Sequence, residues 1–270
     1  MKLVIEPGMA SANYWRDLWR YRELLYFLAW RDLAVRYKQT AIGVAWVLIR
    51  PALTMVAFVA FRRLVGAEPA AVPEPVLVFA AVLPWQFFST AMVDASGSLI
   101  GNANLLSKVY FPRLIIPAAA IVTALVDFLV TLALLGLLMA WYGLAPSWPI
   151  VFMPAFALLA LGLALGTGLL LAALNVKYRD FRYVVPFLVQ MGLFVSPIAF
   201  TSADLPERWR AVYSLNPVVG LIDGFRWTIL GDAAPVAGST VVSSLAVTAV
   251  FVALGIWYFR RVERSFADVI

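Results

Sequence analysis

The chain has 270 residues, a net charge of +6 and neither cysteine nor histidine, and 63% of its residues are hydrophobic. Soluble domains are roughly 45–50% hydrophobic, so this composition predicts an integral membrane protein. The missing cysteines exclude disulfides, thiolate nucleophiles and Cys-ligated metal sites. The missing histidines remove the usual acid–base group at neutral pH.

The first 39 residues are expected to form a cytoplasmic segment with an amphipathic helix over Asn13–Gln39. Its apolar residues recur at helical spacing, with charged residues elsewhere around the helix. Such a helix lies on the membrane surface. It serves either as a lipid anchor or as a platform for a cytoplasmic partner.

Six long apolar stretches occupy the remaining residues, 40–270, which we expect to form one transmembrane domain. The stretches are Thr40–Phe61, Val76–Ile100, Leu114–Trp141, Ile150–Val176, Tyr183–Phe200 and Thr240–Phe259. A helix needs about 20 apolar residues to cross the hydrocarbon core, a length that the fifth stretch barely reaches. Because lipid cannot satisfy a bare backbone, each stretch should be helical. The predicted fold is an all-α membrane protein with six transmembrane helices.

The fourth stretch contains small residues at close spacing: Gly162, Gly166 and Gly168. Small residues four apart let two helices approach closely. We expect tight packing within one chain here, in preference to a dimer seam.

The segment between the fifth and sixth stretches is long and only moderately polar. It contains two short helical patterns, Leu205–Leu215 and Val218–Leu230, separated by Asn216-Pro217. Neither is long enough to span. Non-spanning helices at membrane depth are tolerated where they line a cavity, so we predict a re-entrant helical pair at the outer mouth of a pathway. A surface helical hairpin fits the periodicity equally well.

Positive charge is distributed unevenly among the loops. Most of the 21 lysine and arginine residues lie before Thr40, in Gly101–Arg113, in Lys177–Arg182 and in the tail from Arg260. Short loops rich in Lys and Arg stay in the cytoplasm. The net charge therefore predicts topology, not nucleic-acid binding: both termini should lie on the cytoplasmic side of the inner membrane.

Two charged residues lie inside predicted spans. Arg50 is in the first and Asp127 in the third, both near mid-bilayer at about 1.5 Å per residue. An unpaired charge at that depth is costly. We expect an Arg50–Asp127 ion pair, with a proton or substrate relay as the functional alternative.

Short motifs follow one another in order along nearly the whole chain. They are Arg31-Asp32, Arg36-Tyr37-Lys38-Gln39-Thr40, Leu83-Pro84-Trp85, Asn102-Ala103-Asn104, Lys108-Val109-Tyr110-Phe111-Pro112-Arg113, Asn175-Val176-Lys177-Tyr178-Arg179-Asp180, Leu215-Asn216-Pro217 and Gly224-Phe225-Arg226. As an ordered set they resemble the membrane subunits of ABC-2-type polysaccharide exporters, which move O-antigen, teichoic acid, capsular polysaccharide and related glycans. The second and fifth motifs are closer to the O-antigen and teichoic-acid branch than to the capsule branch.

The resemblance implies a homodimer that works with two cytoplasmic ATP-binding-cassette subunits. ATP and Mg²⁺ would be bound by those partners, with no cofactor in this chain. The sequence has no Gly-x-x-x-x-Gly-Lys-Ser/Thr phosphate loop, which agrees with a separate ATPase. The resemblance also implies that the N-terminal helix and Gly101–Pro112 contact the ATPases. The expected coupling residues are Asn102, Asn104, Lys108 and Tyr110.

The implied substrate is a glycan on a polyprenyl diphosphate, and sugar rings stack on flat apolar side chains. Candidates for the substrate path are Trp46, Trp85, Phe87 and Phe88. Trp85 and Phe88 are three residues apart and share a helical face, so we favour them over Phe87. Helix packing or lipid contact is the alternative role.

The diphosphate of such a substrate needs cations. Candidates near the cytoplasmic surface are Arg36, Lys38, Lys108 and Arg113, each able to donate to phosphate oxygens. Topology and contact with lipid head groups are equally compatible roles.

Three other functions fit a chain with several spans: a secondary transporter, a membrane-embedded enzyme, and an ABC-2 exporter of a smaller lipid or drug. A secondary transporter typically carries an internal repeat, and no span here convincingly repeats another. An enzyme needs clustered carboxylates or histidines, whereas the carboxylates in these spans are scattered. The sequence does not separate the third function from glycan export.

Overall fold

The computed structural model describes residues 14–38, 43, 45–66, 71–202, 205–263 and 266, in which helix is the regular secondary structure found. The helices are α1 (Tyr14–Arg20), α2 (Arg22–Lys38), α3 (Ala45–Leu64), α4 (Glu74–Gly101), α5 (Ala103–Lys108), α6 (Ile115–Trp141), η1 (Trp148–Phe152), α7 (Met153–Lys177), α8 (Phe181–Val195), α9 (Glu207–Tyr213), α10 (Pro217–Leu230), η3 (Gly231–Ala233) and α11 (Gly238–Val262). The predicted start of the first span at Thr40 lies outside these residues.

Five of the described helical segments are long and apolar enough to cross a membrane: α3, α4, α6, η1 with α7, and α11. They correspond to five of the six predicted stretches. The remaining stretch, Tyr183–Phe200, forms the 15-residue helix α8, which ends at Val195. At 1.5 Å per residue it is about 22 Å long, shorter than the roughly 30 Å hydrocarbon core. Pro197 follows an extended Ser196, as expected where a helix stops before proline.

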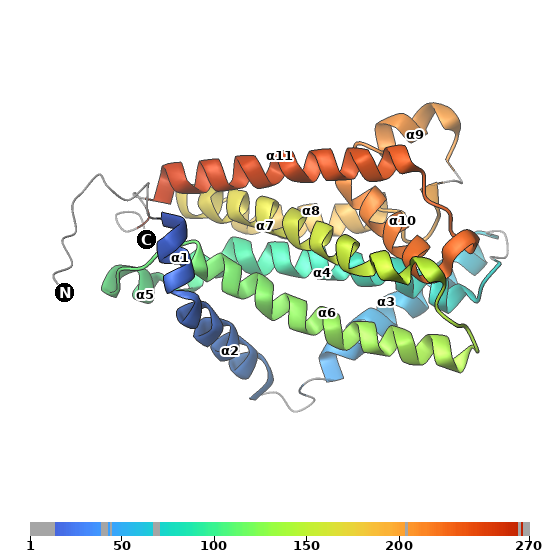
Figure 1. The fold of residues 1–270 in the computed structure, drawn as a ribbon, viewed down its shortest axis with the longest axis horizontal. Coiled ribbons are helices and arrows are strands. Elements are labelled where there is room, and N and C mark those ends of the chain that lie inside the picture. The colour runs from blue at the N-terminus through green and yellow to red at the C-terminus, as the bar shows by residue number, and fades with distance from the viewer. Residues whose placement is uncertain are drawn as a thin grey trace.

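Helix α4 is the centre of the bundle (Figure 1), where it packs against α3, α6, α7, α8 and α10. In its most apolar window 83% of the residues are buried, compared with 17% in α3 and in α11. A helix that is apolar on all sides suits either the interior of a protein or a membrane span. Burial thus distinguishes α4, in the middle of the protein, from α3 and α11, which keep broad surfaces exposed.

Glycine permits a close contact between α7 and α11. A Cβ atom added at Gly255 would collide with the backbone of Gly166, and one added at Gly166 would collide with the backbone of Phe251 and Val252. Gly168 instead faces Ala95 of α4. The small residues of the fourth stretch thus pack within one chain, as predicted.

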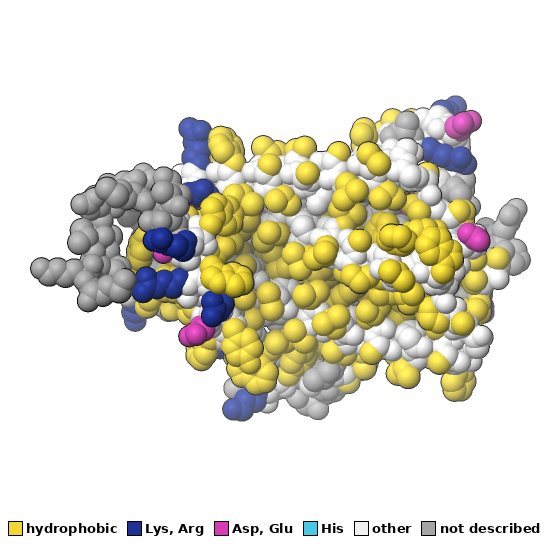
Figure 2. All heavy atoms as spheres, in the orientation of Figure 1, with side chains coloured by type: hydrophobic (Ala, Val, Ile, Leu, Met, Phe, Trp, Pro, Cys, Tyr) yellow, Lys and Arg dark blue, Asp and Glu magenta, His cyan; other side chains and the backbone are white. Residues whose placement is uncertain are grey.

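The two ends of the bundle differ in charge. Figure 2 shows hydrophobic side chains over the middle of the molecule and most of the visible Lys and Arg near one end, with a smaller group at the other. We call this end, which carries α1, α5 and the C-terminal end of α11, the basic end, and the opposite end the α9 end. Tyr14 Oη donates to Glu263 Oε1 at 3.3 Å, so the first described helix and the end of α11 meet at the basic end.

The segment after α8 forms the two short helices that the sequence predicts, α9 and α10. Helix α10 is mostly buried and begins at Pro217, with the Asn216 side chain accepting a hydrogen bond from the Val218 amide. The fully buried Arg226 donates to the carbonyl oxygens of Leu77, Ile198 and Phe200. This guanidinium fastens α10 to α4 and to the turn that follows α8.

Candidate functional site

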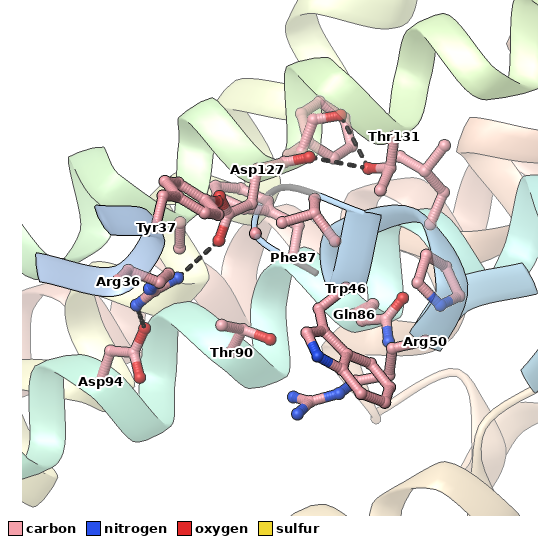
Figure 3. Close-up of a pocket in the computed structure, with 16 residues that line it drawn as sticks. Arg36, Tyr37, Trp46, Arg50, Gln86, Phe87, Thr90, Asp94, Asp127 and Thr131 are labelled. Carbon is pink, nitrogen blue, oxygen red and sulfur yellow. Dashed lines mark hydrogen bonds and ion pairs between the residues drawn. The ribbon is translucent and has the colours of Figure 1, made fainter. Parts of the chain in front are cut away.

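A cavity of about 450 Å³ lies between the end of α2 and helices α3, α4 and α6 (Figure 3). Its lining is mixed, with aromatic side chains, amide and hydroxyl groups, and four charged residues, Arg36, Arg50, Asp94 and Asp127. Ligand pockets commonly measure roughly 300–1,000 Å³ and combine apolar walls with a few polar groups. This cavity is therefore the candidate functional site.

Arg36 closes one side of the cavity by bridging two spans. Its Nη2 atom lies 2.7 Å from Asp94 Oδ2 on α4, and its Nη1 atom lies 2.5 Å from Asp127 Oδ2 on α6. Tyr37 Oη also donates to Asp127. We call these four residues the Arg36 cluster. It anchors the C-terminal turn of α2 to two helices of the transmembrane bundle.

Burial and the neighbouring charges together set the pKa of both α2 residues. Burial alone would lower the pKa of Arg36, but Asp94 and Asp127 outweigh burial, so the pKa is raised. Burial, together with the hydrogen bond to Asp127, raises the pKa of Tyr37. Arg36 therefore stays charged and Tyr37 stays protonated at any pH a cell experiences.

The predicted ion pair between Arg50 and Asp127 is wrong. Both residues line the cavity, but Asp127 is paired with Arg36, which descends from α2. Arg50 lies in the second turn of α3 and lines the cavity together with Gln86 and Thr90, near the middle of α4. In Figure 3 its guanidinium lies beside the Trp46 ring and away from Asp127.

The aromatic lining also differs from the prediction. Trp46 and Phe87 line the cavity, whereas Trp85 and Phe88 do not. Trp85 and Phe88 do share a face, with ring centroids 5.9 Å apart, but that face is turned to α8, where Trp85 lies against Gly192. Phe87 packs against Phe128 of α6, centroid to centroid 5.0 Å. The favoured pair thus supports packing, and Phe87 is the α4 aromatic at the cavity.

A second cavity of about 670 Å³ continues toward the basic end. It shares Arg36 and Asp94 with the first cavity, so the Arg36 cluster lies between the two. Both cavities follow one stripe of α4, whose polar and small members are Gln86, Thr90, Asp94, Gly97, Ser98 and Gly101. This stripe was not predicted, although polar residues four apart in an apolar helix indicate a shared polar face.

The predicted coupling residues lie at the basic end, in or beside α5. Arg31 of α2 donates to Asn102 Oδ1 at 2.7 Å, and Asn102 donates to the Ser98 carbonyl at 2.9 Å. The other three side chains are exposed: Asn104, Lys108 and Tyr110. The structure thus brings Asn102 to the second cavity and leaves the rest of the segment open to a partner.

Of the predicted head-group cations, two are engaged within the chain. Arg36 belongs to the Arg36 cluster, and Arg113 donates through its backbone N–H to Glu263 Oε1 at 3.0 Å and through its side chain to the Glu263 carbonyl. Lys38, at the C-terminal end of α2, and Lys108, at the basic end, are exposed. Burial raises the pKa of Glu263, with Arg113 and Tyr14 opposing that effect.

Across the described part of the chain, no group of His, Cys, Asp or Glu is arranged to hold a metal ion. The donors of the two cavities are guanidinium, amide, hydroxyl and indole groups, and the acids between them are already bound by Arg36. This chemistry can bind a polar organic molecule by hydrogen bonds and stacking.

Comparison with known proteins identifies the family, because the model for ABC-2 type transporters matches residues 23–230. The chain belongs to the ABC-2 type transporter family. A permease protein of an O-antigen export system, RfbA of Myxococcus xanthus, is 31% identical over 92% of this chain and 96% of its own length. Two proteins of the same description from Klebsiella pneumoniae are each 25% identical over 92% of this chain and 95% of theirs. The resemblance drawn from the ordered motifs is thus confirmed.

Proposed function

We propose that this ABC-2 chain is the membrane permease subunit of an ATP-driven exporter that moves a lipid-linked polysaccharide of the O-antigen kind across the cytoplasmic membrane. The observation that carries the proposal is the match to O-antigen export permeases over almost the full length of both chains. The apolar spans and the mixed lining of the cavity are consistent with it.

In this proposal two copies of the chain work with two cytoplasmic ATP-binding-cassette subunits, which bind ATP and Mg²⁺. The basic end faces the cytoplasm, in agreement with the positive-inside rule. The exposed residues of α5 and the following turn, Asn104, Lys108 and Tyr110, contact the ATPase. Exposed apolar side chains on α3 and α8, such as Phe61 and Phe187, are suited to membrane lipid or to the second copy.

The cavity has the side chains that a sugar needs. A sugar ring presents apolar faces and hydroxyl edges, so it binds where aromatic faces and hydrogen-bonding groups lie together. Trp46 and Phe87 provide the aromatic faces, and Gln86 and Thr90 provide the hydrogen-bonding groups. We propose that the glycan passes along the polar stripe of α4. In the same proposal, α8 completes a sixth crossing, and α9 with α10 is a re-entrant pair at the outer mouth.

Complementation tests the function directly. The chain and its ATPase partner are expressed in cells that make the lipid-linked glycan but lack their own permease, and glycan at the cell surface is measured with an antibody. We expect surface glycan only when both proteins are present. The matched control replaces the ATP-binding lysine of the partner ATPase, which should abolish export while the permease remains in the membrane.

Two outcomes would reject the proposal. Glycan export that persists with the inactive ATPase and follows the proton gradient would indicate a secondary transporter. Failure to export the glycan, together with ATP-dependent efflux of a small lipid or drug, would indicate the other substrate class.

A further inference from the structure

One part of the cavity is rich in hydrogen-bond donors that bind nothing within the protein. Arg50, Trp46, Gln86 and Thr90 all line it. Among the described residues, none of these four side chains makes a hydrogen bond or an ion pair within the chain. We call this group the Arg50 pole. Guanidinium and indole groups can only donate, so the Arg50 pole suits a ligand rich in acceptors.

The charge of Arg50 has no internal counter-ion in the described structure. The acids that line the same cavity, Asp94 and Asp127, are held by Arg36. Ionisable side chains within membrane spans normally pair or face a polar cavity, and they commonly mark substrate pathways. An anion supplied from outside the chain would satisfy both the charge of Arg50 and the neighbouring neutral donors.

The surroundings of Arg50 favour a phosphate carried by an amphiphile. Arg50 lines the cavity together with Gln86 and Thr90, near the middle of α4, and its side chain is exposed at the surface of the bundle. The same side of α3 continues to Leu53, three residues on, whose side chain is 61% exposed. A phosphate bound at Arg50 can therefore leave its apolar chain against an apolar helix surface.

Taken together, these features point to a phosphate-binding site. We infer that the Arg50 pole binds the phosphate or diphosphate of the lipid carrier, with the guanidinium donating to two phosphate oxygens and Gln86, Thr90 and Trp46 donating to others. The Arg36 cluster, in which two carboxylates face one arginine, keeps the phosphate on the Arg50 side of the cavity. This inference rests on the proposed function, because the phosphate belongs to the lipid-linked glycan that the proposed function names as the substrate.

Binding to the purified full-length chain in an uncharged maltoside detergent tests the inference. The probes are geranylgeranyl diphosphate, the uncharged alcohol geranylgeraniol, and inorganic pyrophosphate, with equilibrium binding measured by thermophoresis. The variants are Arg50→Gln and Arg50→Lys. The matched control is Arg179→Gln, which removes an exposed arginine from the turn between α7 and α8, outside the cavity.

We expect the unmodified chain to bind the diphosphate lipid at least about tenfold more tightly than either other probe. Arg50→Gln should weaken that binding by about 10- to 100-fold, the range expected for a charge-assisted hydrogen bond. The affinity of Arg50→Lys for the diphosphate lipid should lie between those of the unmodified chain and Arg50→Gln, since lysine keeps the charge and loses the paired donors. Arg179→Gln should bind as the unmodified chain does. Unchanged thermal midpoints of all variants establish that they are folded.

Three results would overturn the inference: equal binding by Arg50→Gln and the unmodified chain, equal binding of the alcohol and the diphosphate, or equal weakening by Arg179→Gln. Pyrophosphate that binds as tightly as the lipid, and that is lost in Arg50→Gln, would reject the lipid carrier in favour of a free phosphate. Complementation separates this inference from the proposed function, because export by the unmodified chain does not depend on which cation holds the phosphate.

Discussion

Replacing Arg36 by methionine should destabilise the protein, because it leaves two carboxylates facing each other without their shared cation. Methionine keeps most of the apolar stem of arginine and removes its charge. The side chains of Arg36, Asp94 and Asp127 are 32%, 28% and 17% exposed, so this ion cluster is neither buried nor fully solvated.

The expected cost lies between two limits. Removing one partner of a buried ion pair costs about 3–5 kcal/mol. Exposed pairs contribute about 0–1 kcal/mol. For partly exposed groups that repel each other once Arg36 is gone, we expect about 2 kcal/mol. In a chain of this size that corresponds to a fall of about 4–8 °C in the thermal midpoint.

Thermal unfolding of the purified chain in detergent, followed by size-exclusion chromatography, measures this effect. The control is Lys38→Met, which removes an exposed cation from the same helix and should leave the midpoint unchanged. Neutralising both acids as well, with Asp94→Asn and Asp127→Asn in the Arg36→Met background, should recover part of the loss. Equal midpoints for the Arg36 and Lys38 variants, or a further loss on neutralising the acids, would refute the reasoning.

Three more outcomes follow from the packing and the charges. Phe87→Leu should lower glycan export at normal expression, whereas Phe88→Leu should lower the stability of the protein more than its export. Surface glycan measures the first effect and folded yield measures the second. Gly255→Leu should reduce the folded yield, since the side chain would collide with the α7 backbone, while Gly136→Leu, which meets open space, should not. Because burial raises the pKa of Glu263, the stability that this residue contributes is fully present below its ordinary pKa of 4.5. That contribution is lost as the pH rises through the raised pKa. Glu263→Gln should therefore make the thermal midpoint less dependent on pH between pH 5 and 8. An unchanged pH dependence of the midpoint would contradict this assignment.

The helices could be predicted well from the sequence, because the patterns that indicate a helix are local. A run of about 20 apolar residues can satisfy its backbone in lipid only as a helix. The observed α4, Glu74–Gly101, therefore matches the predicted Val76–Ile100 to within two residues. Asn216-Pro217 likewise separates α9 from α10, because proline fits the first turn of a helix and not its interior.

Residue contacts between distant segments were not predictable in the same way. Matching Arg50 and Asp127 by depth assumed that only charges within spans can meet, whereas the cation that binds Asp127 comes from α2, 91 residues earlier. The face of α4 that would line the cavity also depended on where α8 packs. Trp85 and Phe88 share a face as expected, yet α8 covers that face, and Phe87 is left at the cavity.

The position of α2 gives the two cavities a mechanical link. One helix carries Arg31, bonded to Asn102 at the start of α5, and Arg36, bonded to Asp94 and Asp127 between the cavities. A rigid helix transmits movement along its length, and these two attachments are five positions apart on α2. In the proposed transporter, a displacement of α5 by the ATPase would pull on Arg31 and, through α2, on the cluster that separates the cavities. In that proposal, a push on Asn102 at the basic end changes the width of the passage between the cavities without touching it.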